Sequence, residues 1–414
     1  MTAPRTLLDE SGHDPRRWRV LALLALAEFL GMSLWLTASA VSPQLRALWG
    51  LSATEGAWLT TIVQLGFVVG TAAAAVLNLA DLLPARAYFA IAAALGALLN
   101  AGVIVAPGYK SALIFRFLTG VALAGVYPPA MKMIATWFRA RRGLAIGTIV
   151  GALTVGKATP YLVHALEGGA VRPVILGASF GALVAAALVA LFYRDGPFPF
   201  PRRPFSWGLV HEVVSRREWR LATGGYLGHM WELYSFWAWI ATFLAASATV
   251  RTAAGASAPS AKVVEMLAFG AIAIGGLGCI AGGWIADRIG YERLVTRAMA
   301  TSAACALAIG FVFGHSFWIV VPLSWVWGIA VIADSAQFSA LVAESVPAHA
   351  VGTALTLQTS LGFLLTMVTI QLIPPVVGLV GWRWAFAMLA IGPTLGIDAI
   401  QRLRAVRTSR KQHA

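Results

Sequence analysis

The chain alternates between long apolar stretches and short polar segments along its whole length. An apolar helix of about 20 residues can cross the hydrocarbon core of a bilayer. With 59% hydrophobic and 12% charged residues, a chain of 414 residues has too little polar surface to cover a soluble globule. We therefore predict an all-α integral membrane protein with twelve transmembrane helices. The predicted spans are residues 18–41, 55–78, 86–106, 111–135, 143–166, 172–193, 220–246, 263–286, 293–313, 317–342, 350–377 and 380–401.

Basic residues in the short segments between the spans account for most of the formal net charge of +14. Counted along the predicted spans, 22 Lys and Arg residues lie on the side of both termini and 6 on the other side. The positive-inside rule therefore predicts a multi-pass protein of the cytoplasmic (inner) membrane with both termini in the cytoplasm. Because topology explains the charge, we expect a lipid bilayer around the protein and no nucleic-acid partner.

A proline-rich polar interval divides the chain into two halves. Residues 194–219 contain four prolines followed by a short amphipathic stretch, which indicates a stiff linker and a helix on the inner membrane surface. We expect two six-helix bundles, residues 1–193 and 220–414, with this linker between them.

The two halves also resemble each other as a repeat. Four pairs of positions correspond in order, at offsets that drift only from 204 to 209 residues. The pairs are Glu28 with Glu232, Asp81 with Asp287, Gly120 with Gly328, and Gly143 with Gly352. This pattern predicts duplication of a six-span unit. Because each unit has an even number of spans, the two copies have the same orientation in the membrane and are related by a pseudo-twofold axis along the membrane normal.

Two motifs resemble signatures of the major facilitator superfamily. The sequence from Gly283 through Asp287 to Arg293 is similar to the family's Gly-x-x-x-Asp-Arg-x-Gly-Arg loop, and the first-half copy keeps only Asp81 and Arg86. Arg116 and Gly120 match the family's Arg-x-x-x-Gly signature in span four. The resemblance covers the whole chain and implies the major facilitator fold, alternating access, and a set of inner-gate residues. These gating residues are Asp81, Arg86, Asp287, Arg288 and Arg293.

Ionisable residues inside the predicted spans require an explanation, because each costs about 2.5–3.5 kcal/mol at mid-membrane. We consider six: Glu28, Arg116, Lys132, Lys157, Glu232 and Asp334. Lys157 lies too deep to snorkel, and its repeat partner is the neutral Thr366. A cation in one half only indicates a contact for an anionic substrate, or a partner for Glu28 or Glu232. Lys132 is close enough to the inner surface to snorkel, and Asp334 either pairs with Lys132 or lines the inner vestibule.

Glu28 and Glu232 are repeat-related carboxyls, and His229 lies one helical turn before Glu232. They either exchange protons during transport or simply bridge helices in neutral form. The predicted proton-coupling residues are Glu28, Glu232 and His229. The predicted substrate-binding residues are Lys157, Arg116, Glu28, His229, Glu232, Tyr234 and Trp231.

These features predict a secondary transporter that moves a small anionic solute by alternating access, as a uniporter or by proton-coupled symport, and that works as a monomer. The span-five lysine and the inner-loop pattern from Trp137 to Gly143 look similar to those of bacterial permeases for nitrate-like, cyanate-like or organic anions. The Asn- and Gly-rich nitrate signature of that group is absent. One alternative is a proton-driven exporter of drugs or metabolites, but the segment from Gly147 to Pro160 departs from the exporter signature. The other is a membrane sensor without flux. No nucleotide loop, metal-ligand spacing or nucleophile is present, so we expect no enzyme activity, cofactor or metal.

Overall fold

The computed structural model describes residues 14–139, 141–198, 206–347 and 349–412, and within these ranges the chain is helical and without strands. The helices of the N-terminal half are α1 (Arg17–Met32), α2 (Thr37–Ala40), α3 (Ser42–Trp49), α4 (Ala53–Val76), α5 (Leu79–Leu82), α6 (Ala85–Gly102), η1 (Val103–Val105), α7 (Tyr109–Leu123), α8 (Tyr127–Ala135), α9 (Arg142–Leu166) and α10 (Val171–Phe192). The linker helix is α11 (Trp207–Ser215). Those of the C-terminal half are α12 (Arg217–Ala253), α13 (Ala261–Ala273), α14 (Gly275–Ile289), α15 (Tyr291–Ala308), α16 (Phe317–Ala333), α17 (Ser335–Glu344), α18 (Val351–Ala385), η2 (Phe386–Ala390) and α19 (Ile391–Gln412).

Nine helical segments of the described chain are long and apolar enough to cross a membrane. The longest, Val351–Ser409, contains two of the predicted spans, which separate at Gly381, where φ is +71°. A left-handed backbone of this kind suits glycine because it has no Cβ. The two remaining predicted spans correspond to α1 with α2 and to α15, so the described helices account for all twelve. The all-α fold class is confirmed.

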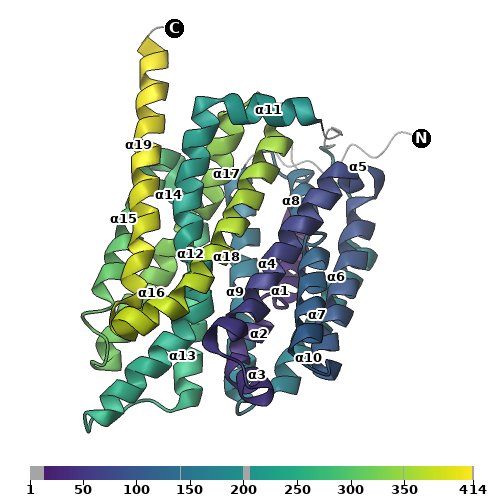
Figure 1. Ribbon diagram of the computed structural model, residues 1–414. Coiled ribbons are helices and arrows are strands. Elements are labelled where there is room, and N and C mark those ends of the chain that lie inside the picture. Colours follow the sequence, from purple (N-terminus) through teal and green to yellow (C-terminus); the bar gives the residue numbers. More distant parts are fainter. Residues whose placement is uncertain (1–13, 140, 199–205, 348, 413–414) are drawn as a thin grey trace.

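The two halves stand side by side as helical bundles (Figure 1). The linker helix α11 lies across one end of the molecule, where α5 and the far end of α19 also lie. We call this end the termini face. The short helices α2 and α3 lie at the other end, which we call the opposite face.

Several spans are interrupted within the bundles. Span one bends between α1 and α2, span four between α7 and α8, and span ten at Asp334 between α16 and α17. In span four, two prolines lie in the first turn of α8. Backbone N–H groups of a first turn have no partner within the helix, so proline costs no helical hydrogen bond there. Interruptions free backbone carbonyls at membrane depth, and these groups need partners inside the protein.

Three helix pairs make most of the contact between the halves: α9 with α13, α9 with α14, and α4 with α18. Helix α9 approaches α14 closely because glycines line the contact. A Cβ at Gly151 would lie 2.9 Å from the carbonyl oxygen of Gly276, and one at Gly147 would lie 3.1 Å from that of Cys279. Small residues allow two membrane helices to pack backbone to backbone. The N-terminal and C-terminal halves are therefore in contact along α9.

Candidate functional site

Lys157 is held at the interface between the halves, with only 2% of its surface exposed. Its Nζ donates a hydrogen bond of 2.5 Å to the hydroxyl of Tyr234. The same atom lies 4.1 Å from the ring centroid of Trp35, 4.8 Å from that of Tyr234 and 5.3 Å from that of Trp237. Aromatic faces attract a cation through their quadrupole, and this attraction grows when water is excluded. The surroundings of the ammonium are thus mainly aromatic.

Two further rings extend this aromatic environment. Phe363 lies 5.3 Å from Trp35 and 5.2 Å from Tyr234 between ring centroids, and Phe67 lies 4.7 Å from Phe363. These distances are typical of favourable aromatic pairs. We call the resulting set the Lys157 cluster, and it comprises Lys157, Trp35, Phe67, Tyr234, Trp237 and Phe363. Three members come from each half, so relative movement of the halves would divide the cluster.

Polar atoms in and near the cluster lack hydrogen-bond partners. The indole Nε1 atoms of Trp35 and Trp237 are buried and form no hydrogen bond with the described part of the chain. Glu28 on α1 is 0% exposed, and neither of its carboxyl oxygens has a hydrogen-bond partner within the ranges that the structure describes. Glu28 and Lys157 interact electrostatically, although they form no ion pair within 4.0 Å among the described residues. Buried polar groups are normally satisfied, so this concentration of unmade bonds marks a candidate ligand site.

Arg116 on α7 is fully buried, and its guanidinium nitrogens all donate hydrogen bonds within the N-terminal half. Nη2 donates to the carbonyl oxygen of Trp35 at 2.6 Å, and Nη1 donates to that of Leu34 at 3.0 Å. Nε donates to the carbonyl of Leu59, and Nη1 also reaches Thr37 and Asn100. Arg116 therefore supplies partners for the carbonyls freed where span one bends. In this structure Arg116 therefore holds the backbone at Leu34 and Trp35, and the substrate contact expected from the sequence stays a prediction.

Glu232 on α12 lies in a very different environment from Glu28. Its Oε1 accepts a hydrogen bond of 2.6 Å from Trp327 Nε1, and its Oε2 accepts one from Ser302. Both donors belong to the C-terminal half. The carboxyl is thus held by fixed donors on α15 and α16.

His229, one turn earlier on α12, is paired with Asp334 rather than with Glu232. Its Nδ1 lies 2.9 Å from Oδ1 of Asp334, and both side chains are almost fully buried. Asp334 occupies the interruption of span ten. Trp231, also proposed for the site from sequence, donates from Nε1 to the carbonyl of Met388 in η2 and is not part of the Lys157 cluster.

The expected gating residues lie near the termini face. A Cβ at Gly143, in the first turn of α9, would be 3.7 Å from Oδ1 of Asp287 on α14. A carboxylate near a helix N-terminus is favoured by the helix dipole. The Arg288 guanidinium stacks 3.3 Å from the ring of Trp284, and Arg293 is exposed in the first turn of α15.

In the first half, Arg86 is half-buried at the start of α6. The side chain of Asp81 lies outside the described part of the chain.

A polar contact toward the opposite face was missed in the sequence. Nδ1 of His164 on α9 lies 2.8 Å from Oε2 of Glu265 on α13, and Nε2 of His164 contacts Gln44 at 2.9 Å. In addition, the Tyr161 hydroxyl donates to the carbonyl of Trp237. Both His164 and Glu265 fall inside predicted spans, so the presence of ionisable groups was a signal that could have identified them.

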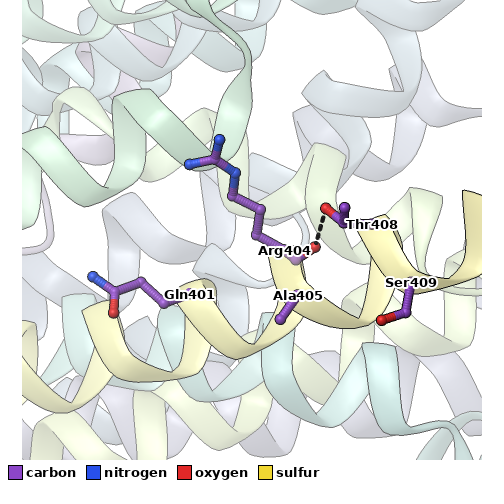
Figure 2. A pocket seen from close by; sticks show the side chains of 5 residues that line it. All are labelled: Gln401, Arg404, Ala405, Thr408 and Ser409. Atoms are coloured by element: carbon purple, nitrogen blue, oxygen red, sulfur yellow. Dashed lines mark hydrogen bonds between the residues drawn. The ribbon is translucent and has the colours of Figure 1, made fainter. Parts of the chain in front are cut away.

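A hollow on the protein surface lies far along α19 and is lined by residues of that helix alone (Figure 2). Thr408 donates a hydrogen bond there to the carbonyl of Arg404, the bond that Ser and Thr side chains in helices make to the carbonyl four residues earlier. Because the hollow involves none of the buried charged residues, we do not assign it a function.

Comparison with known proteins agrees with this architecture. Residues 21–370 match the Major Facilitator Superfamily. The fold is similar to that of a bacterial homologue of the human lysosomal transporter Spinster in its inward-facing, unoccupied conformation, with a TM-score of 0.66 and 15% identity over 95% of this chain and 96% of that one.

The fold is also similar to that of the nucleoside transporter NupG, with a TM-score of 0.67 and 14% identity over 93% of this chain and 99% of that one. At these identities the likeness shows the fold alone. No curated protein matches the sequence. Since the family match extends over most of the chain, from Leu21 in α1 to Ile370 in α18, this protein belongs to the major facilitator superfamily of membrane transporters.

Proposed function

We propose that the protein is a secondary transporter for a small anionic solute, with Lys157 as its principal cationic contact and Glu28 as its proton-binding group. The observation that carries this proposal is a buried ammonium between the halves that has no carboxylate within 4.0 Å among the described residues. A buried charge without a charged partner is costly, and an anionic solute would supply the missing charge. The unbonded indole N–H groups of Trp35 and Trp237 provide further donors at the same place.

Charge balance supports proton coupling through Glu28. Lys157 and Glu28 carry opposite formal charges and interact at a distance, which partly compensates each of them. An anion that approaches Lys157 adds a negative charge beside Glu28, and two negative charges in a low-dielectric region repel each other. Uptake of a proton by Glu28 removes that repulsion. Anion and proton would then bind together, which is the behaviour of a symporter.

The proposal includes a mechanism and a topology. Residues 1–193 and 220–414 would rock against each other and divide the Lys157 cluster, with Asp287 and its neighbours closing the inner gate. The excess of basic residues on the termini face supports a cytoplasmic location of both ends in the inner membrane. The resemblance to nitrate-like and organic-anion permeases rests on the span-five lysine and on the inner-loop pattern from Trp137 to Gly143. We propose a monomer as the transporting unit.

Binding of simple anions to the purified protein tests the proposal. Sodium propionate, benzoate and nitrate should be compared with sodium chloride in a thermal-shift assay in detergent, since a ligand of the folded state raises the melting temperature. We expect at least one of these anions to raise it in the wild type and to lose its effect in Lys157→Gln. If none of them shifts the melting temperature of the wild type, or if the shift persists in Lys157→Gln, the anion site is wrong.

A second candidate is a proton-driven exporter of organic cations. It is supported by the unbonded Glu28 carboxyl beside an aromatic environment, which is the chemistry that also recognises alkylammonium groups. Tetraethylammonium chloride in the same thermal-shift assay separates the two candidates. A shift with tetraethylammonium that disappears in Glu28→Gln, without any anion effect, would favour the exporter.

A further inference from the structure

The aromatic rings around Lys157 indicate the shape and polarity of the substrate, in addition to the charge that Lys157 indicates. Resting on the proposed anion site, we infer that the substrate is an aromatic monocarboxylate, an anion with one carboxylate on a flat apolar ring. Inorganic oxyanions and short aliphatic acids would then be poor ligands. The inference depends on the number of charges at the site and on the arrangement of its rings.

The donors present suit one carboxylate group. Lys157 provides one formal positive charge, and the indole N–H groups of Trp35 and Trp237 provide two neutral donors that are buried and unbonded. A carboxylate has two oxygens that accept several hydrogen bonds, so one ammonium and two N–H groups can satisfy it. A dianion such as sulfate would leave one negative charge uncompensated near Glu28. The site therefore favours a monoanion.

The ring arrangement suits a flat apolar body. Between ring centroids, Trp35 lies 5.3 Å from Phe363 and 5.8 Å from Tyr234, and Phe67 lies 4.7 Å from Phe363. These contacts cross between the halves, because Trp35 and Phe67 belong to the N-terminal half and Tyr234 and Phe363 to the C-terminal half. When the halves move apart, each ring loses its partners across the interface. An aromatic ring of the substrate can replace those contacts, whereas nitrate or propionate offers no ring face.

Binding constants for matched ligands test the inference on the full-length protein in detergent. Benzoate and cyclohexanecarboxylate have the same number of carbon atoms and the same charge, but only benzoate is flat and aromatic. We expect the dissociation constant of benzoate to be lower than that of cyclohexanecarboxylate by about two- to tenfold, the range typical of one aromatic pair. Propionate and nitrate should bind more weakly than both.

A variant series locates the effect in the cluster. Phe363→Leu should weaken benzoate binding by about two- to tenfold and leave propionate binding unchanged, while Phe363→Tyr, which retains a ring, should keep the preference for benzoate. Phe243→Leu is the matched control, because Phe243 is also buried but packs on Phe313 and Phe386, which are not part of the Lys157 cluster. The melting temperature of each variant without ligand shows whether it is folded.

The results separate failure of this inference from failure of the proposed function. If nitrate or propionate binds as tightly as benzoate, and all three lose binding in Lys157→Gln, the aromatic class is overturned while the anion site stands. The class is also overturned if Phe363→Leu and Phe243→Leu weaken benzoate equally. If no anion binds to the wild type, the anion site itself fails, and the inference fails with it.

Discussion

The two halves of this transporter carry a glutamate at the same position of the repeat, but the two carboxyls have different surroundings. Neither carboxyl oxygen of Glu28 has a hydrogen-bond partner in the described chain, whereas Glu232 accepts hydrogen bonds from Trp327 and Ser302. A carboxylate that already has two donors gains little from a ligand, while one without donors gains much. From this comparison we expect substrate and proton chemistry to be concentrated in the N-terminal half.

Other repeat positions show the same asymmetry. Lys157 corresponds to Thr366, whose hydroxyl donates to the carbonyl of Phe363 in its own helix. Asp334 at the interruption of span ten corresponds, at the offset of 208 residues that relates Gly120 to Gly328, to the apolar Val126. The backbone interruption is thus shared, but its ionisable group belongs to the C-terminal half alone. The two halves therefore share the arrangement of their helices but differ in the ionisable residues at equivalent positions.

The largest effect on anion binding is expected when Lys157 is replaced by threonine, the residue at the equivalent position of the C-terminal half. Lys157→Thr should weaken binding of a responsive anion by about 30-fold or more, because truncating one member of a buried charge pair costs about 2–5 kcal/mol. Titration of the anion against the purified variant measures the loss. As a control, Thr366→Ser alters the equivalent position without changing charge and should leave anion binding unchanged.

The same variant decides whether Glu28 depends on Lys157 as its counter-charge. If it does, Lys157→Thr should also lower the melting temperature, and adding Glu28→Gln should restore part of the loss. An unchanged melting temperature in Lys157→Thr would contradict a structural pairing of the two residues.

A smaller but more selective effect is expected from the two glutamates. Glu28→Gln should make transport of a responsive anion in proteoliposomes independent of pH, because an amide cannot take up a proton. Glu232→Gln should instead keep the pH dependence and lower the stability by about 1–3 kcal/mol, since one hydrogen bond of the carboxyl is lost. Flux measured at several pH values, with melting temperatures of both variants, tests this. If Glu232→Gln removed the pH dependence, the division between the halves would be wrong.

A third effect concerns the pair that is specific to the C-terminal half. His229 and Asp334 are in contact, so the variants His229→Gln and Asp334→Asn should not act additively on stability. We expect an interaction of about 0.5–3 kcal/mol in a double-mutant cycle based on denaturation of the purified protein. Additive effects would show that the two side chains are independent. His164→Gln, which lies at the interface of the halves, provides a comparison outside this pair.

The smallest effect is expected at the termini face, where α11 contacts the C-terminal half. A hydrogen bond from His349, assisted by Arg216, lowers the pKa of Glu212 on α11 below its usual value. A lowered pKa in the folded protein means that the ionised carboxylate is stabilising. Its contribution is complete above about pH 4.3 and is lost as the pH falls through the folded-state pKa.

Glu212→Gln should therefore lower the melting temperature slightly at pH 7, and the difference from the wild type should shrink on acidification. Melting curves between pH 3 and pH 7 measure it. A difference that stays constant over this range would rule out the ionised carboxylate as its cause.

The fold was largely predictable because hydropathy is a local property. Spans one and nine do not meet the length and hydropathy that mark the other spans, yet the predicted ranges 18–41 and 293–313 correspond to α1 with α2 and to α15. The membership of the site was less predictable. Helical spacing placed His229 beside Glu232, but the structure pairs it with Asp334, which is 105 residues away in the chain. Similarly, the depth of Arg116 indicated a site residue, but the carbonyls it satisfies become available only where span one bends.

The sequence by itself determined that this is a membrane protein, how many spans it has, and which ionisable residues lie within those spans. These properties follow from transfer free energies that add up residue by residue along the chain. Only the tertiary structure decided which partner each buried charge has. Lys157 is hydrogen-bonded to Tyr234, 77 residues away in the sequence, and Glu232 to Trp327, 95 residues away. Such contacts depend on how the helices pack. Two glutamates at equivalent positions therefore look alike in the sequence, and only the structure shows that Glu232 accepts two hydrogen bonds while Glu28 accepts none from the described residues.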